Sequence, residues 1–147
     1  MFHGMSRRMS VDEWRAFVSH GTRTGKLAVT RRDGRPHVVP VWFVLDGDDV
    51  VFTSDGSSLK TRALRREQRA CICVDLEEPP YAYVQLSGPV TLSEDVSEML
   101  PLATRIGRRY MGDDRAEEFG RRNAVAGELL VRLHVEAIVA VDDVAGY

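Results

Sequence analysis

The stretch Lys26-Leu27-Ala28-Val29-Thr30, followed by Arg32-Asp33-Gly34-Arg35 and by an apolar run that begins at His37, decides the fold. Apolar residues alternate along the first run, and Asp-Gly is a pair typical of tight turns between antiparallel strands. The segment therefore predicts a β-hairpin. From His37 to Leu45 nearly every residue is apolar, so we expect this strand to be covered on both faces, by the core on one side and by a ligand or a subunit on the other.

Further elements follow on both sides of this hairpin. Ser10 and Glu13 form a capping box, which predicts a short helix that ends near His20. Asp46-Gly47-Asp48-Asp49 predicts a second tight turn. The six expected strands cover residues 26–30, 37–45, 50–54, 70–75, 81–92 and 129–141. Apolar residues recur at strict period two along the last segment, which predicts one continuous strand.

Helices are expected after the third and the fifth of these strands. The first covers residues 57–66. A second follows Ser93, and a third covers residues 113–123. Pro101 is compatible with the helix after Ser93 if it falls within the first few residues, whose N–H groups have no partner anyway. Six strands in hairpin order with these helices predict a mainly β fold with α-helices, a six-stranded antiparallel Greek-key barrel.

The run Ser57-Ser58-Leu59-Lys60-Thr61-Arg62-Ala63-Leu64-Arg65-Arg66 begins a helix with cations and no acid. A helix start normally favours acidic residues, because its N-terminal end carries a partial positive charge. A first turn with unpaired N–H groups, two serine hydroxyls and Lys60 is what a bound phosphate or carboxylate would need. The alternative is a solvated helix whose Arg65 and Arg66 suit its C-terminal end.

Length and composition predict one domain over residues 1–147 with an ordinary hydrophobic core. A formal net charge of -2 argues against a nucleic-acid partner. No apolar run approaches the ~20 residues that span a bilayer, and the N-terminal residues 1–8 lack the apolar core of a signal peptide. We therefore expect a cytoplasmic protein without membrane contact.

Metal binding and disulfide formation are not expected. Cys71 and Cys73 are the two cysteines, and two residues apart on one strand they are badly placed for an unstrained disulfide, so buried thiols are expected. The four histidines are scattered without the spacing of metal ligands. The sequence also lacks a Gly-rich phosphate loop and a G-x-S-x-G motif, which leaves cofactor binding as the expected chemistry.

Three segments carry a resemblance to a known family. They are Gly25-Lys26-Leu27-Ala28-Val29-Thr30, Asp33-Gly34-Arg35-Pro36-His37-Val38-Val39-Pro40-Val41-Trp42-Phe43, and Phe52-Thr53-Ser54 followed by Leu59-Lys60-Thr61-Arg62-Ala63-Leu64-Arg65-Arg66. In this order and spacing the chain resembles the pyridoxamine-phosphate-oxidase-like split barrels, and within them the small actinobacterial oxidoreductases that use the deazaflavin coenzyme F420. The resemblance covers about residues 20–92, and the last strand also matches.

The resemblance implies a split β-barrel that forms a homodimer, with two cofactors at the subunit interface. It also implies the cofactor-binding residues. Lys60, Thr61 and Arg62 match the positions that hold the cofactor's phosphate, and Ser58 before them is also expected to bind the cofactor. Pro40, Val41 and Trp42 match the positions along its ring system, and Thr53 and Ser54 the strand end beside it. Judged from the residues alone, Trp42 could instead be a core aromatic, and Thr53 an edge-strand residue.

The activity that the resemblance implies is F420-dependent hydride transfer from the reduced deazaflavin to a small, electron-poor organic substrate. Oxidases of the family that use FMN carry one arginine on the second strand and another just before the phosphate lysine. This chain has Val38 or Val39 and Ser58-Leu59 at those places. An FMN-binding oxidase and a non-catalytic flavin or deazaflavin carrier or sensor are the alternatives. No catalytic residue is assigned, and a proton could come from solvent or from a side chain such as Tyr81 or Tyr83.

Overall fold

The computed structural model describes residues 7–146, and strands dominate it. Residues 1–6, which contribute to the expected lack of a signal peptide, lie outside the described residues. Within residues 7–146, no helix is long and apolar enough to cross a membrane. The elements are β1 (Arg7–Arg8), α1 (Val11–Ser19), β2 (Gly25–Thr30), β3 (Pro36–Val41), β4 (Val44–Asp46), β5 (Asp49–Asp55), α2 (Leu59–Glu67), β6 (Arg69–Leu76), β7 (Ala82–Ser93), α3 (Val96–Met111), a 3-10 helix η1 (Asp113–Arg115), α4 (Ala116–Asn123), β8 (Glu128–His134) and β9 (Ala137–Asp142).

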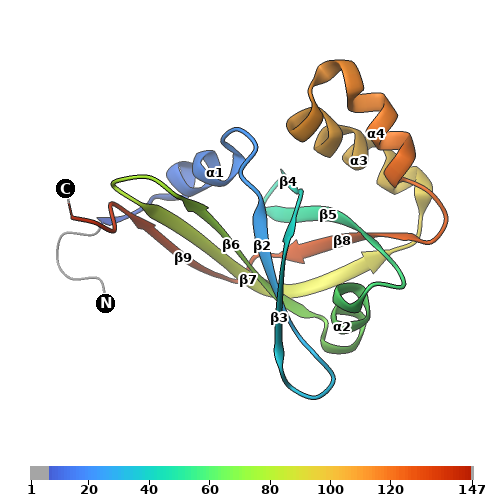
Figure 1. Cartoon of the computed structure of the whole chain (residues 1–147), viewed down its shortest axis with the longest axis horizontal. Coiled ribbons are helices and arrows are strands. Elements are labelled where there is room, and N and C mark those ends of the chain that lie inside the picture. Colours follow the sequence, from blue (N-terminus) through green and yellow to red (C-terminus); the bar gives the residue numbers. More distant parts are fainter. Residues whose placement is uncertain (1–6, 147) are drawn as a thin grey trace.

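The strands pair antiparallel in the order β3-β2-β6-β7-β8-β5-β4, and β9 pairs with both β7 and β1. β7 is shared by the two halves of the sheet, because residues 83–87 pair with β9 and residues 90–93 pair with β8. One end of β7 lies beneath α1, and the other runs toward α3 and α4 (Figure 1). The mainly β architecture is confirmed, as are the helices after the third and fifth predicted strands, which are β5 and β7.

The C-terminal apolar segment forms two strands, so the prediction of one continuous strand is wrong. β8 ends at His134 and β9 begins at Ala137, and both lie along β7. A Cβ atom added at Gly88 of β7 would lie 2.0 Å from the carbonyl oxygen of His134, so the backbones of these two segments lie very close together. The N–H of Glu136 donates to the carbonyl oxygen of Ser87 at 2.9 Å. The bend therefore depends on a glycine far away in the sequence.

The second predicted strand is also divided, because the chain leaves the sheet at Trp42 and Phe43. β3 ends at Val41 and β4 begins at Val44. Along β3, Val38 is 60% exposed and Pro40 is exposed as well. The core thus covers one face of β3 only, and cover of the other face by a ligand or a subunit stays a prediction.

Two hydrophobic clusters hold the fold together. The larger fills the space between the sheet and the helices α1 and α2, and includes Phe43, Phe52 and Leu64, all fully buried. The smaller lies between α3 and the strands β5 and β8, where Met99 packs with Val51 and Leu130. The predicted capping box that begins α1 is present, with the Ser10 N–H donating to Glu13 and the Glu13 N–H to Ser10.

Helix α3 begins at Val96, so Pro101 is its sixth residue and lies beyond the first four, whose N–H groups have no partner in a helix. The expectation that Pro101 falls within the first few residues is therefore wrong. α3 packs closely on α4 at Gly120, where a Cβ atom would lie 2.1 Å from Thr104 Oγ1. The two helices consequently behave as one packed pair at one end of the barrel (Figure 1).

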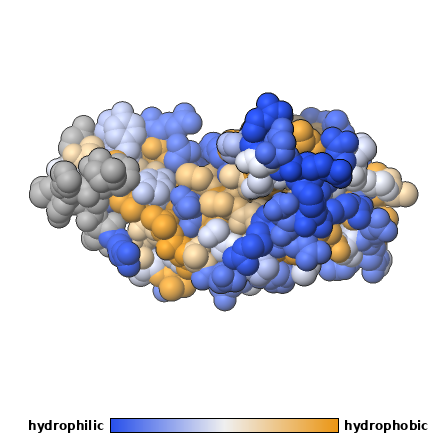
Figure 2. Space-filling model, turned by 90° about the horizontal axis from the view of Figure 1, so that it is seen from below, coloured by the Kyte–Doolittle hydropathy of each residue, from blue (hydrophilic) through white to orange (hydrophobic). Residues whose placement is uncertain are grey.

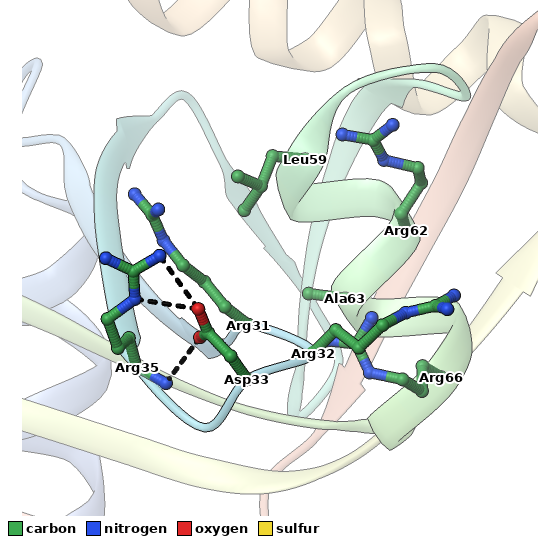
Figure 3. Close-up of a pocket in the computed structure, with 8 residues that line it drawn as sticks. All are labelled: Arg31, Arg32, Asp33, Arg35, Leu59, Arg62, Ala63 and Arg66. Atoms are coloured by element: carbon green, nitrogen blue, oxygen red, sulfur yellow. Dashed lines mark hydrogen bonds and ion pairs between the residues drawn. The ribbon is translucent and has the colours of Figure 1, made fainter.

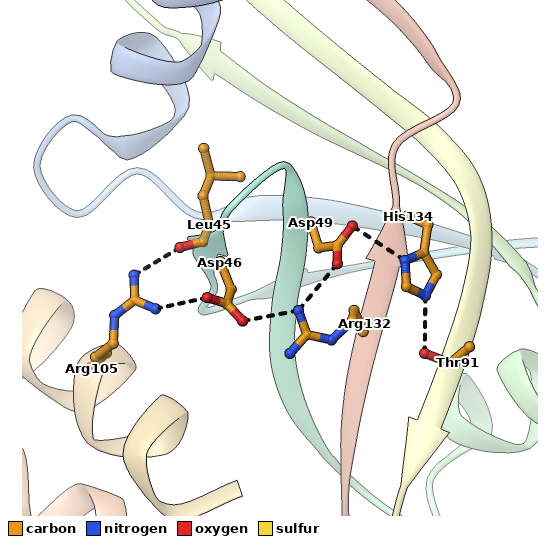
Figure 4. A network of polar contacts seen from close by, with 7 residues as sticks. All are labelled: Leu45, Asp46, Asp49, Thr91, Arg105, Arg132 and His134. Atoms are coloured by element: carbon orange, nitrogen blue, oxygen red, sulfur yellow. Dashed lines mark hydrogen bonds and ion pairs between the residues drawn. The ribbon is translucent and has the colours of Figure 1, made fainter. Parts of the chain in front are cut away.

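A polar network attaches α3 to the turn between β4 and β5 (Figure 4). Arg132 Nη1 on β8 lies 3.0 Å from Asp46 Oδ2 and 3.1 Å from Asp49 Oδ2. Arg105 on α3 donates to the carbonyl oxygen of Leu45 at 2.8 Å. These contacts fix the position of α3 relative to the strands below it.

The two cysteines are unpaired, as expected, but they are half-buried on β6 rather than buried. Their side chains point away from the core, because Ala70, Ile72 and Val74 occupy the alternate positions that face it. Burial raises the pKa of both thiols. Within residues 7–146, no group of three or more His, Cys, Asp or Glu residues could hold a metal ion.

Candidate functional site

A cluster of hydroxyl groups joins the end of strand β5 to the start of helix α2. The buried side chains of Ser54 and Thr61 meet at 2.6 Å between their hydroxyl oxygens. Thr61 Oγ1 also donates to the carbonyl oxygen of Asp55 at 2.6 Å, and the Thr61 N–H donates to Ser58 Oγ at 3.3 Å. These contacts orient the first turn of α2 against β5, and they determine where Lys60 lies.

The two serines that we expected to offer hydroxyls to an anion are engaged within the chain. The Oγ and the N–H of Ser57 both donate to Asp55 Oδ1, each at 2.7 Å. Ser58 Oγ donates to the carbonyl oxygen of Asp55 at 2.9 Å. Asp55 therefore supplies the acceptors for both serines, and a role for them at an anion stays a prediction. The hydrogen bonds from Ser57 also hold the pKa of the Asp55 carboxyl below its usual range.

The end of β3, the end of β5 and the first turn of α2 open into one cavity of about 560 Å³, which we call the Trp42 pocket. Six of the nine predicted cofactor-binding residues line it. The helices α3 and α4 and the start of β8 close its other side. Its lining residues are Pro40, Val41, Trp42, Thr53, Ser54, Asp55, Lys60, Ile106, Met111, Phe119, Arg122, Asn123 and Glu128.

Trp42 is a wall of this pocket and not a core side chain, since 38% of it is exposed. Its ring stacks on Tyr110, with centroids 5.0 Å apart and 6° between the ring planes. Phe119 of α4 lies 6.0 Å away at a tilted angle. Stacked and tilted pairs at these separations are favourable arrangements of aromatic rings. The pocket therefore offers a rigid aromatic surface.

Tyr110 and its neighbour Arg109 connect this aromatic surface to the rest of the fold. Tyr110 Oη donates to the carbonyl oxygen of Arg23 at 2.9 Å and accepts from the Phe43 N–H at 3.3 Å. Burial lowers the pKa of the Arg109 guanidinium. The guanidinium donates to the carbonyl oxygens of Val18 (2.6 Å), Gly21 (2.8 Å), Phe43 (2.8 Å) and Arg23 (3.2 Å). The segment that carries Trp42 is thus held from α3.

Two cations and two carboxylates line the Trp42 pocket, namely Lys60, Arg122, Asp55 and Glu128. Their formal charges cancel. Burial raises the pKa of the Glu128 carboxyl, the negative charge of Asp55 adds to this rise, and the positive charge of Lys60 opposes it. Of the two carboxyl groups in the pocket, Glu128 is therefore the one that is protonated more readily.

The three remaining predicted site residues lie elsewhere. Thr61 is fully buried, and its hydroxyl and N–H are both used in the junction between β5 and α2. Ser58 belongs to the same junction. Arg62 lines a separate cavity between α2 and the β2–β3 hairpin (Figure 3). Their roles in holding a phosphate stay predictions.

Tyr81 and Tyr83, named from the sequence as possible proton donors, do not line the Trp42 pocket of their own chain. They line another cavity, together with Cys73 and Asp75. Glu128 and the residues from α3 and α4 were not predicted, because no local pattern marks a helix that packs over a distant strand end. The apolar spacing along α4, with Phe119 buried, was the available signal.

The chain matches a known protein family along most of its length. A family model described as Pyridoxamine 5'-phosphate oxidase matches residues 10–142. Comparison with curated proteins finds no match.

Several solved structures share the fold. The conserved hypothetical protein Rv2991 from Mycobacterium tuberculosis has a TM-score of 0.80 and is 22% identical, with 92% of this chain and 86% of that chain covered. An F420 reductase has a TM-score of 0.64 and is 23% identical, with 84% and 94% covered. A FAD-binding protein from Mesorhizobium loti has a TM-score of 0.66 and is 18% identical, with 94% and 98% covered. These likenesses confirm the predicted fold class, a split barrel.

Proposed function

Because the chain belongs to the pyridoxamine 5'-phosphate oxidase family, we propose that it is an oxidoreductase that binds coenzyme F420 in the Trp42 pocket. The reaction is hydride transfer to a small, electron-poor organic substrate. One observation carries the proposal. Residues from β3, β5 and α2 that were predicted to bind the cofactor, on separate stretches of sequence, line one cavity.

The residues of the pocket suit a flavin-like ring. Pro40, Val41 and Trp42 provide an apolar and aromatic wall, and Trp42 is held in place by its stacking on Tyr110. A cavity of about 560 Å³ falls within the usual range for small-molecule sites, which is ~300–1,000 Å³. Lys60 and Arg122 can pair with negative groups of the cofactor, although Asp55 and Glu128 offset part of their charge.

When bound, reduced F420 supplies the hydride. The residues of this chain supply position and proton control. The wall at Trp42 would fix the plane of the cofactor's ring and exclude water from one of its faces. This would hold the ring in a reactive orientation. Glu128, whose pKa is raised by burial, is the carboxyl of the pocket that would exchange a proton with the bound molecules.

F420 is preferred to FMN because of two positions. FMN-using oxidases of the family carry an arginine on the second strand and another just before the phosphate lysine, whereas this chain has Val38 or Val39 and Ser58-Leu59 there. The F420 reductase and the FAD-binding protein among the structural relatives are too distant, at 23% and 18% identity, to decide between cofactors.

We also propose that the protein is a homodimer with its cofactors at the interface. The outer face of β2, β3, β6, β7 and β9 includes Val38 and Val139, which are 60% and 45% exposed. From below, hydrophobic side chains gather over the middle of the molecule, beside a hydrophilic region (Figure 2). An apolar sheet face of this kind is typical of a surface that a partner covers.

Turnover of reduced F420 tests the proposed reaction. The protein is mixed with reduced F420 and a panel of electron-poor acceptors, such as nitroaromatic compounds and unsaturated ketones, and oxidation of the cofactor is followed by absorbance. We expect at least one acceptor to speed oxidation above the rate without protein. If F420 binds but no acceptor in a broad panel does so, the carrier or sensor alternative replaces the enzyme. If FMN binds and F420 does not, the FMN oxidase replaces it.

A further inference from the structure

A second cavity, of about 510 Å³, lies between the β2–β3 hairpin and helix α2 (Figure 3). We call it the arginine pocket, and of the residues predicted to bind the cofactor only Arg62 lines it. The hairpin and the helix form its two walls, with Leu59 and Ala63 as the apolar residues. Its charged lining residues are Arg31, Arg32, Asp33, Arg35, Arg62 and Arg66.

The walls of the arginine pocket are well fixed. The N–H of Arg31 donates to the carbonyl oxygen of Arg35 at 2.8 Å, and the N–H of Gly34 donates to the carbonyl oxygen of Arg31 at 2.9 Å, which closes the turn. Arg66 of α2 reaches across and donates to the carbonyl oxygen of Thr30 at 2.6 Å. The backbone that carries these arginines is therefore held in place by hydrogen bonds.

Most of the positive charge in the arginine pocket is not balanced by a carboxylate of the described residues. Asp33 pairs with Arg35, whose Nε lies 2.8 Å from Asp33 Oδ2, and these hydrogen bonds hold the pKa of Asp33 below its usual range. Arg66 Nε lies 3.0 Å from Glu67 Oε2, and Glu67 is not among the residues that line the pocket.

The other three arginines form no ion pair with a carboxylate of residues 7–146. Arg31 Nη2 contacts His37 Nδ1 at 3.5 Å, and its buried Nε has no acceptor among the described residues. For Arg32 and Arg62 no ion pair occurs within residues 7–146. Like charges gathered around one cavity repel one another, and a bound anion would relieve that repulsion. The Trp42 pocket, in contrast, has equal numbers of cations and carboxylates.

We propose that the arginine pocket binds an oxyanion with at least two negative charges, of the diphosphate or polycarboxylate class. Guanidinium groups present paired N–H donors that match the oxygens of phosphate and carboxylate groups. Five guanidinium groups on two facing walls suit a ligand with several such oxygens better than they suit a ligand with a single negative charge. The proposal does not rest on the proposed function, since the anion binds without a cofactor in the Trp42 pocket.

Such an anion could arrive in two ways, as a separate molecule or as the charged end of a bound cofactor. Leu59 and Arg62 line the arginine pocket, and Lys60, between them in the same turn of α2, lines the Trp42 pocket. A long cofactor could thus reach both cavities around the start of this helix. Both sources use the same charged groups, and experiment distinguishes them.

The test is calorimetric titration of the whole protein with sodium pyrophosphate at low ionic strength. Arg32→Ala and Arg62→Ala remove side chains that make no ion pair within residues 7–146, so both variants should fold. Each should weaken pyrophosphate binding by about tenfold or more, the scale of a lost charged hydrogen bond. Asp33→Asn removes the one negative charge of the pocket and should tighten binding, a gain that misfolding cannot produce.

Arg121→Ala is the matched control, because Arg121 is an exposed arginine on α4, outside both pockets. It should bind pyrophosphate as the wild type does. Equal affinity in the wild type and the Arg32→Ala/Arg62→Ala double variant would overturn the proposal, and so would an equal loss in Arg121→Ala.

Titration of the same double variant with F420 separates the two sources. Loss of affinity for both ligands assigns the anion to the cofactor, and loss for pyrophosphate alone assigns it to a separate molecule. If the wild type binds F420 but not pyrophosphate, only the arginine pocket fails. If it binds pyrophosphate but not F420, only the proposed function fails.

Discussion

The indole ring of Trp42 lies almost parallel to the phenol ring of Tyr110, with 5.0 Å between the ring centroids and 6° between the planes. The two residues come from different parts of the chain, Trp42 from the end of the β2–β3 hairpin and Tyr110 from the last turn of α3. Tyr110 also hydrogen-bonds to the backbone of Arg23 and Phe43. The pair therefore joins the barrel to the helices that close the Trp42 pocket.

Removing the ring of Tyr110 should loosen Trp42. In Tyr110→Ala we expect weaker cofactor binding and a red-shifted Trp42 fluorescence, because the indole loses its stacking partner. Tyr110→Phe keeps the ring and loses only the hydroxyl, so its cofactor affinity should stay close to that of the wild type. The change in fluorescence is read in a Trp14→Phe background, where Trp42 is the remaining tryptophan. Equal affinity in Tyr110→Ala and the wild type would show that the stacked pair does not shape the site.

Arg109 is expected to matter for stability more than its neighbour Arg108. Its guanidinium donates to the carbonyl oxygens of four residues, and a half-buried network of this kind is costly to break. Arg109→Met should lower the free energy of unfolding by about 2–4 kcal/mol in a urea titration. Arg108→Met, which removes an exposed ion pair with Asp113, should change it little. Similar losses in both variants would contradict the assignment.

Glu128 should make the protein less stable at neutral pH than it would be without this carboxylate. Its pKa is raised by burial, so its contribution to stability is present below the pKa in the unfolded chain and is lost as pH rises through the folded value. Glu128→Gln should therefore melt at a higher temperature than the wild type at about pH 7, and at a similar temperature near pH 4. Thermal unfolding at both pH values measures this. A Glu128→Gln variant that melts below the wild type at neutral pH would contradict this, because the Glu128 carboxylate would then be stabilised by its surroundings.

The opposite sign is expected for Glu118, whose pKa is held low chiefly by the hydrogen bond from Arg115. The contribution of Glu118 to stability is present above the unfolded pKa and is lost as pH falls, so Glu118→Gln should be less stable than the wild type at neutral pH.

Local patterns were enough to predict most elements of this fold. The Ser10 and Glu13 capping box and the Asp33-Gly34 turn each act over a few residues, and the structure confirms both. The division between β8 and β9 could not be predicted in this way. Apolar alternation continues through residues 134–137, and the break is imposed by close contact with Gly88 of another strand.

The proposed dimer gives a prediction at Val139, which lies opposite Gln85 on the outer face of the sheet. Val139→Lys places a charge in the middle of the proposed interface, and burial of an unpaired charge is unfavourable. Sedimentation equilibrium should give a dimer for the wild type and a monomer for Val139→Lys. Val125→Lys is the control, because Val125 is similarly exposed, 43% against 45%, but lies just after α4. A monomeric wild type would contradict the dimer.

The candidate site was only partly visible in the sequence. Pro40, Trp42 and Lys60 could be picked out because each lies in a stretch that resembles a family, and all three line one pocket. The cover from Phe119 and Glu128 depends on how α3 and α4 pack, and Gly120 makes that packing possible through its close approach to Thr104. Contacts of this kind join distant segments, and no short stretch of sequence contains them.

The most direct test of the central claim is a fluorescence titration of the purified protein with F420 and with FMN, side by side, in the wild type and in Lys60→Ala. We predict that the wild type binds F420 more tightly than FMN, and that Lys60→Ala weakens F420 binding by roughly 1.5–3 kcal/mol through the loss of a charged hydrogen bond. Arg121→Ala, outside the pocket, should bind F420 as the wild type does. Tighter binding of FMN, or F420 affinity that Lys60→Ala leaves unchanged, would contradict the assignment of the Trp42 pocket to a deazaflavin.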